Sequence, residues 1–337
     1  MKRLVNTGSE IVIFFYIAIF LIFISCVNEP EVDPLASIKT ANNRYLQGYS
    51  ISFSLELRKG AQASDYEFIW DFGDSLAGAG YELEHIYIYP GTYHIEVHTD
   101  GNSKSEILTK TIEVLPSLEL VSTHSLNLDA PSGLSFGANG ESLWIVSDKP
   151  SGKVVQVDLE GNLLRTLPYR GADLEGIEFD IRDSSLWVID ESLAELIHLD
   201  SNGVEISSQV INGIPGGGGL EGITLDITHS RMFLLKEKDF GALITLEQNG
   251  LEQSITHLNF APDYSAIAYI PSTDKLWILS DESSTVYHTN IDGTPIADYG
   301  IDMVQPEGLV YDDVEGVFYI VDDTTEKLHK YRFWENI

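Results

Sequence analysis

The sequence predicts an all-β protein with two folded parts, a small N-terminal β-sandwich followed by a five-bladed β-propeller. Two observations lead to this expectation. A motif of the type Leu-Glu-Gly-Ile recurs after residue 116, and an apolar strand follows each copy. Ahead of these repeats, short alternating runs are separated by turn residues, which is typical of a sandwich.

The C-terminal repeats share one register. Their anchor positions are Ser132, Glu175, Glu221, Ser265 and Glu307, separated by steps of 43, 46, 44 and 42 residues. An acid stands sixteen residues after each anchor, at Asp148, Glu191, Glu237, Asp281 and Asp323. A glycine turn follows in four of the repeats, at Gly161, Gly203, Gly250 and Gly293. A period of this length with four short antiparallel strands per unit is typical of propeller blades.

The fifth repeat reaches only its third strand before Ile337. Residues 117–126 have strand character and stand just before the first blade, where a fourth strand would lie. We therefore expect this strand to pair with the last blade and to close the ring, which would hide two open sheet edges. The propeller would then occupy residues 116–337.

Residues 1–25 have a basic start and a continuous apolar run over 11–24, which fits a signal peptide better than a membrane span. Phe23-Ile24-Ser25-Cys26 resembles a bacterial lipobox, with Phe23 where the pattern prefers Leu, and this resemblance makes Cys26 the lipidation site. The alternative is an uncleaved anchor helix. Residues 26–35 are acidic and contain proline, as in a tether. Cys26 is the only cysteine, so no disulfide forms within one chain.

Residues 36–115 carry the sandwich pattern and two motifs, Trp70-Asp71-Phe72-Gly73-Asp74 and His85-Ile86-Tyr87-Ile88-Tyr89-Pro90-Gly91-Thr92-Tyr93. The segment resembles the PKD domain, an immunoglobulin-like module, with Ser75 where that pattern has glycine. The resemblance implies that Trp70 belongs to the core and that the aspartates and glycines shape a turn. We expect a spacer or adhesive module.

The chain is strongly acidic, with 20 basic and 52 acidic residues and a net charge of −32. Such a surface repels nucleic acid and anionic lipid headgroups, which require basic patches. It favours divalent cations, although solubility alone accounts for much of the charge. We expect a monomer that does not bind nucleic acid.

Carboxylates are expected to gather at one mouth of the propeller channel, because the first and second strands of each blade are antiparallel. The start of the first strand and the end of the second then lie at the same end of the blade. The inner set is Glu175, Glu221 and Glu307. The outer set is Asp148, Asp190, Glu191, Glu237, Asp281, Asp322 and Asp323. For the five acids that stand sixteen residues after the anchors, a structural role in the loop is favoured over a metal site. Two explanations remain open for the inner set: a metal site, or an architectural role in which each glutamate caps backbone N–H groups of the next blade.

Residues 116–337 resemble the SdiA-regulated family of five-bladed propellers. The residues that carry the resemblance are Leu174-Glu175-Gly176-Ile177, Leu220-Glu221-Gly222-Ile223 and Pro306-Glu307-Gly308-Leu309, with Leu186-Trp187-Val188 and Leu276-Trp277-Ile278. This resemblance implies bound calcium and a place in the cell envelope. Because Ser132 and Ser265 replace glutamate in two blades, any metal site would be asymmetric.

One motif is rejected. Gly133-Leu134-Ser135-Phe136-Gly137 spells a nucleophile elbow, which requires a strand-to-helix turn. Ser135 instead aligns with Glu178, Thr224 and Val310 inside the first strand of other blades.

Two functional classes follow from these patterns. The first is a calcium-binding propeller that acts as an extracytoplasmic binding or scaffold module for an unknown protein, peptide or glycan, held at the outer membrane by a lipid anchor. The second is a calcium-dependent hydrolase of the phosphoesterase or lactonase type, with Asp190 or Asp322 as the base. The scarcity of basic residues at the predicted mouth favours binding, and whether the protein is an enzyme stays open.

Overall fold

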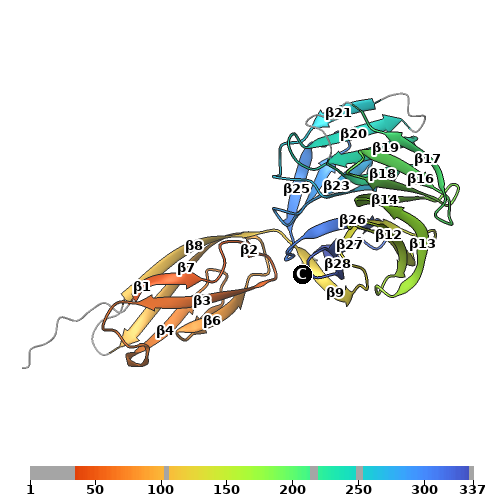
Figure 1. Cartoon of the computed structure of the whole chain (residues 1–337). Helices are drawn as coiled ribbons and strands as arrows, with labels where there is room; N and C mark the ends of the chain where they lie inside the picture. The colour runs from red at the N-terminus through yellow and green to blue at the C-terminus, as the bar shows by residue number, and fades with distance from the viewer. Residues whose placement is uncertain (1–34, 102–105, 213–218, 248–252, 334–337) are drawn as a thin grey trace, which may run out of the picture.

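The computed structural model describes residues 35–101, 106–212, 219–247 and 253–333. In these ranges the chain consists of β-strands and one short 3₁₀ helix, η1 (Ala63–Asp65), which confirms the predicted fold class. No helix in the described part has the length and apolar character needed to cross a membrane. Figure 1 shows an elongated sandwich joined to the rim of a propeller. The predicted signal peptide and Cys26 lie outside the described residues.

The sandwich is made of two sheets. One sheet has the order β1 (Leu35–Thr40), β3 (Ser50–Leu57), β6 (Glu82–Ile86). The other has the order β2 (Tyr45–Leu46), β8 (Glu106–Leu115), β7 (Gly91–Gly101), β4 (Tyr66–Asp71), β5 (Ala77–Ala79). The sheets enclose an aromatic core around Trp70, whose indole nitrogen donates a hydrogen bond to the Gly80 carbonyl at 2.9 Å.

The turn after β4 is shaped by aspartates. Asp71 accepts a hydrogen bond from the Gly73 amide at 2.9 Å, and Asp74 accepts one from the Leu76 amide at 3.1 Å. Ser75 has a φ of 73°, in the left-handed region that favours glycine, which explains why glycine suits this position. The aspartates therefore stabilise a turn, as predicted.

The propeller contains five four-stranded sheets, here called blades 1 to 5. Blade 1 comprises β10 (Pro131–Phe136), β11 (Ser142–Ser147), β12 (Gly152–Asp158) and β13 (Leu163–Gly171). Blade 2 comprises β14 (Leu174–Asp180), β15 (Ser185–Asp190), β16 (Glu195–Leu199) and β17 (Glu205–Val210). Blade 3 comprises β18 (Leu220–Asp226), β19 (Arg231–Lys236), β20 (Ala242–Glu247) and β21 (Gln253–His257). Blade 4 comprises β22 (Ala266–Ile270), β23 (Lys275–Ser280), β24 (Thr285–Asn290) and β25 (Pro295–Gly300).

Blade 5 comprises β26 (Pro306–Asp312), β27 (Val317–Asp322), β28 (Lys327–Phe333) and β9 (Leu118–Ser125). The antiparallel pairing of β9 with β28 confirms the predicted closure. Leu118 is completely buried at this seam, and Glu119 forms an ion pair with Arg332 at 2.5 Å. The strand that precedes blade 1 in sequence thus completes the last blade.

Apolar side chains pack between neighbouring blades. Trp144 of blade 1 packs with Ile177 and Val188 of blade 2, and Trp277 of blade 4 packs with Leu309 of blade 5. The tryptophans therefore belong to the inter-blade core. The innermost strands β10, β14, β18, β22 and β26 contact one another in a closed ring around the channel.

The sandwich contacts the propeller through a short connection. Ser117 forms a parallel bridge with Gly300 and donates a hydrogen bond from its hydroxyl to the Gln47 carbonyl at 2.5 Å. Arg44 of the sandwich donates hydrogen bonds to the Ser284 carbonyl and the Thr285 hydroxyl of the propeller, both at 3.0 Å. The sandwich is thereby attached to the outer part of blade 4, away from the channel.

Candidate metal centre

The anchor residues lie at irregular positions of the innermost strands. In blades 1, 2, 3 and 5 the pairing of the first two strands changes register at the anchor, for example between Leu174 and Ile177. Such a bulge redirects the side chain that it carries. In blade 4 the anchor Ser265 precedes β22, and its amide donates a hydrogen bond to the carbonyl of Leu279, the pairing partner of Ala266, at 2.9 Å. Four anchors therefore lie at a register shift within the strand pairing, whereas in blade 4 the pairing begins after the anchor.

The glycine after each of these anchors allows neighbouring strands to approach closely. A Cβ atom on Gly133 would lie 2.2 Å from the Glu175 carbonyl oxygen, and one on Gly308 would lie 2.2 Å from the Ser132 carbonyl oxygen. Any side chain at these positions would collide with the backbone of the next blade. The glycine of the Glu-Gly motif is therefore architectural, whereas this packing does not explain the glutamate.

An acidic cavity of about 210 Å³ lies at the channel mouth formed by the anchors. Seven carboxylate side chains line it: Asp148, Glu175, Glu191, Glu221, Glu237, Glu307 and Asp323. The other polar side chains in its lining are those of Ser132 and Gln305, and no lysine or arginine of the described chain is among the lining residues. The structure thus brings all three predicted inner glutamates together with four of the outer acids.

Backbone hydrogen bonds place the outer acids beside the anchors. In four blades the amide of the outer acid donates to the carbonyl two residues before the anchor. The pairs are Asp148 to Ala130 at 3.0 Å, Glu191 to Asp173 at 2.9 Å, Glu237 to Gly219 at 2.8 Å and Asp323 to Gln305 at 3.0 Å. The repeated spacing of sixteen residues therefore reflects a repeated contact between the ends of two paired strands.

The carboxylates form two groups within which the oxygen atoms lie within 4.8 Å of one another. The Asp148 cluster contains Asp148, Asp173 and Glu175, and the Glu191 cluster contains Glu191, Glu221 and Glu237. Asp173 was not predicted from the sequence. The sequence pattern that could have identified Asp173 is its position two residues before the anchor. The same position carries an acid in blade 4, at Asp263.

Burial and mutual repulsion raise the pKa values of these carboxyl groups. Burial is the main cause for Glu175, whose pKa rises to about 8, and repulsion from Asp148 and Asp173 adds to it. Burial likewise raises the pKa of Glu307 to about 9 and that of Asp173 to about 7. The pKa of Glu221 is raised well above its usual range, first by burial and then by Glu175. The cavity therefore disfavours the fully ionised state unless a cation is present.

The hydrogen bond that the Glu175 carboxylate accepts is not the one expected for the architectural role, in which the donors would be backbone N–H groups of the next blade. Its carboxylate accepts a hydrogen bond from the Ser132 hydroxyl of the neighbouring blade at 2.7 Å. The same hydroxyl lies 3.0 Å from the Glu175 carbonyl oxygen. The serine that replaces glutamate in blade 1 thus orients the glutamate of blade 2.

Two lysines lie at the edge of the Glu191 cluster. Lys238 forms ion pairs with Glu237 at 2.6 Å and with Glu282 at 3.3 Å. Lys236 is buried, and its ammonium group donates a hydrogen bond to the Lys238 carbonyl. Its charge also opposes the rise in the pKa of Glu191 that burial and Glu237 produce. The lysines compensate part of the negative charge at this side of the cavity.

Three of the predicted outer acids are absent from the cavity lining. Asp190 is buried and accepts hydrogen bonds from the Ala172 amide and the Ser192 hydroxyl, both at 2.8 Å. Asp322 accepts one from the Thr325 amide at 2.7 Å. Both aspartates therefore stabilise loops. They do not face the cavity with the neighbouring Glu191 and Asp323, because successive side chains along a strand point to opposite faces.

Asp281 of blade 4 also lies outside the cavity lining. The carboxylate of Asp263 accepts hydrogen bonds from the Ser280 hydroxyl at 2.5 Å and from the Glu282 amide at 3.1 Å. Burial, with repulsion from Asp263, raises the pKa of Asp281 to about 6. Blade 4, whose anchor is Ser265, adds no carboxylate to the lining of the cavity.

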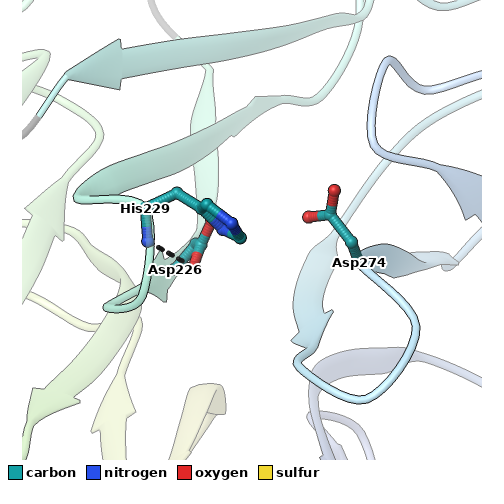
Figure 2. Close-up of side chains that lie close together, drawn as sticks. All are labelled: Asp226, His229 and Asp274. Atoms are coloured by element: carbon teal, nitrogen blue, oxygen red, sulfur yellow. Dashed lines mark hydrogen bonds and ion pairs between the residues drawn. The ribbon is translucent and has the colours of Figure 1, made fainter.

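A further group of possible ligands lies at the opposite ends of blades 3 and 4. Figure 2 shows Asp226 and His229 on one turn and Asp274 on the turn of the neighbouring blade. The His229 ring nitrogen lies 2.8 Å from Asp226. The Arg231 guanidinium bridges the two aspartates, at 2.5 Å from Asp226 and 2.7 Å from Asp274. This arginine already supplies the positive charge, so the group is an ion-pair network of the protein itself.

The chain is similar in structure to a chain of a nidogen/laminin complex, with 12% identity, a TM-score of 0.47 and coverage of 79% of this chain and 88% of that chain. It is also similar to an auxiliary nutrient binding protein from Bacteroides thetaiotaomicron VPI-5482, with 11% identity, a TM-score of 0.45 and coverage of 90% and 100%.

A protein of unknown function from the same bacterium has 12% identity, a TM-score of 0.44 and coverage of 86% of this chain and 82% of that chain. Two family models match the sequence. The model of the PKD domain matches residues 31–115, and the SdiA-regulated model matches residues 118–326. Since the SdiA-regulated model covers more than half of the chain, from β9 to the turn before β28, the chain belongs to the SdiA-regulated family.

Proposed function

We propose that the protein is a calcium-binding propeller that acts as an extracytoplasmic binding or scaffold module at a membrane. The observation that carries this proposal is the convergence of seven carboxylates from four blades on one cavity of about 210 Å³. Two unit charges 4 Å apart repel by about 4 kcal/mol at an effective dielectric constant near 20. A bound cation removes this repulsion.

The donor set fits calcium. Calcium takes six to eight oxygen ligands at 2.3–2.6 Å and tolerates irregular geometry. Two oxygens on opposite sides of the ion would be about 5 Å apart, and the oxygens within each cluster lie within 4.8 Å of one another. Zinc prefers nitrogen and sulfur ligands in tetrahedral sites, which neither cluster offers.

Each of the two clusters would hold one calcium ion. In the Asp148 cluster the ion would be held by Asp148, Asp173 and Glu175, and in the Glu191 cluster by Glu191, Glu221 and Glu237. When bound, calcium would neutralise the cavity and crosslink neighbouring blades. Glu307 and Asp323 line the same cavity and would add negative charge around both ions.

We further propose that Cys26 carries a lipid that holds the protein at the outer membrane, with the PKD domain as a spacer. The support is the apolar run followed by the lipobox-like Phe23-Ile24-Ser25-Cys26. Replacing Cys26 with Ser should move the protein from the membrane fraction to the soluble fraction and abolish incorporation of labelled fatty acid. Unchanged membrane association of Cys26→Ser would favour an uncleaved anchor helix.

The hydrolase alternative receives less support. Its two candidate bases, Asp190 and Asp322, accept hydrogen bonds from loop groups and do not line the cavity. Without a positioned base the cavity has the means to bind an ion but not to activate water efficiently. Turnover of phosphoesters or lactones that requires calcium and Glu175 would reverse this preference.

Calorimetric titration of the chelator-treated chain with calcium tests the proposal. We expect two binding events in the wild type, of which Glu175→Gln weakens one and Glu221→Gln the other. Glu205→Gln, at an exposed position of β17, provides the matched control and should bind like the wild type. Absence of calcium binding in the wild type would leave the glutamates with an architectural role.

A further inference from the structure

A second cavity lies at the opposite end of the channel and has a different chemistry. This apolar cavity has a volume of about 450 Å³ and is lined by the ends of all five innermost strands. Its size falls within the range of small-molecule sites. Between it and the acidic cavity, the architectural glycines leave only about 10 Å³ of free space. The two cavities are therefore distinct sites.

Aromatic side chains from four blades contribute to the walls of the apolar cavity: Phe136, Phe179, Tyr269 and Tyr311. Six isoleucine and leucine side chains also belong to the lining. Two carboxylates, Glu178 and Asp313, are part of the lining, and no lysine or arginine of the described chain is. A ligand for this cavity would need an apolar body and would be favoured by positive charge.

Glu178 carries a charge that the fold does not require. It occupies the third position after the anchor in blade 2. The same position is Ser135, Thr224, Ala268 and Val310 in the other blades. Ser135 accepts a hydrogen bond from the Phe179 amide at 3.0 Å, and Thr224 accepts one from the Tyr269 amide at 3.1 Å. A hydroxyl therefore suffices for the contact with the next blade, and a half-buried carboxylate is costly without a charged partner.

The environment of Glu178 leaves its charge uncompensated. The Ser135 hydroxyl and the Leu225 amide provide hydrogen bonds to its carboxyl group, but both donors are neutral. Burial raises the pKa of Glu178 to about 8, and repulsion from Asp180 adds to the rise, while no lysine or arginine of the described chain lines the cavity. Asp313, the other carboxylate in the lining, is already engaged by the Ser272 amide at 2.9 Å and hydroxyl at 2.8 Å.

We propose that the apolar cavity binds a small organic cation, with its ammonium group on the Glu178 carboxylate and its hydrocarbon part against the aromatic and aliphatic walls. An ammonium group donates charge-assisted hydrogen bonds to a carboxylate, and aromatic faces attract cations. This site is independent of the calcium proposal, since it uses different residues at the other end of the channel.

The test compares phenethylamine, which is protonated at neutral pH, with its uncharged analogue 2-phenylethanol. Both are titrated calorimetrically into the whole chain with calcium present, so that the acidic cavity is occupied. We expect the amine to bind at least tenfold more tightly than the alcohol. Glu178→Gln should lower the amine affinity at least tenfold and leave the alcohol unaffected, whereas Glu205→Gln should change neither.

A second variant locates the site without altering charge. Ala268 lines the apolar cavity, and Ala268→Leu would fill part of it, so both compounds should bind more weakly. The comparison of the two compounds in the wild type, together with Ala268→Leu, decides the question even if Glu178→Gln does not fold. Equal affinities, no binding of either compound, or amine binding that is lost in Glu175→Gln but kept in Glu178→Gln would overturn the proposal.

Discussion

Without calcium, the propeller should lose stability as the pH rises. The pKa of Glu175 is raised from its ordinary value of 4.5 to about 8 in the folded state, chiefly by burial. Folding therefore favours the protonated form of this carboxyl group. Its contribution to stability is fully present below about pH 4.5, where both states are protonated, and is lost as the pH rises through about 8.

The size of the effect follows from the shift. One pKa unit corresponds to about 1.4 kcal/mol, so Glu175 taken alone would lower the free energy of unfolding by roughly 4 kcal/mol between pH 4.5 and pH 8. Glu307 extends the loss of stability to higher pH, because burial raises its pKa to about 9. Calcium should abolish most of this dependence, since it stabilises the ionised carboxylates.

The assay is urea unfolding at pH 5 and pH 8, with calcium or with chelator, on the wild type and on Glu175→Gln. Glutamine is neutral at both pH values, so in chelator at pH 8 the variant should be the more stable protein by up to about 4 kcal/mol. With calcium the order should reverse. A variant that is less stable by the same amount with and without calcium would refute the reasoning and assign Glu175 an architectural role.

Three further predictions concern the framework of the propeller. Gly308→Ala should destabilise the propeller by several kcal/mol, because its Cβ would lie 2.2 Å from the Ser132 carbonyl oxygen; thermal unfolding measures this. Leu118→Ala should lower the free energy of unfolding by about 2–5 kcal/mol, since it empties a buried position at the seam of the ring. Arg231→Met should cost about 3–5 kcal/mol near neutral pH, because it removes the guanidinium that balances the charge of the buried Asp226 carboxylate and leaves it only the contacts with His229.

Each of these predictions has its own control. For the glycine, Gly140→Ala places a Cβ in open space and should cost only about 1–2 kcal/mol for its positive φ. For the seam, Leu120→Ala on the exposed side of β9 should have little effect. For the arginine, Asp226→Asn combined with Arg231→Met should recover much of the loss. Equal losses within a pair would contradict the proposed contact.

Much of the fold could be predicted from the sequence because a propeller repeats local pairings. The steps of 42 to 46 residues between anchors recur with the same strand order, and each hairpin is formed by neighbours in the chain. The long-range closure by β9 was also predictable, because an unpaired strand before blade 1 and a missing strand in blade 5 require one another.

The acidic cavity was predictable only in outline. Antiparallel pairing within a blade places Glu175 and Glu191 at the same end, and this is encoded locally. Asp190 is adjacent to Glu191 in the sequence but binds the Ala172 amide instead, because strand alternation turns the two side chains to different sides. Asp281 kept the repeat spacing and still fell outside the cavity lining, in the blade where the Asp263 carboxylate binds the neighbouring Ser280 hydroxyl and Glu282 amide.

The sequence by itself therefore determined the number of blades, their strand order, the closing strand and the end of the channel at which the acids gather, since all of these follow from pairing between nearby segments. Only the tertiary structure decided that Asp173 joins Asp148 and Glu175, and that Glu178 faces an apolar cavity at the far end. These groupings bring together side chains of different blades, and their distances depend on how closely the glycines let the five innermost strands approach around the channel.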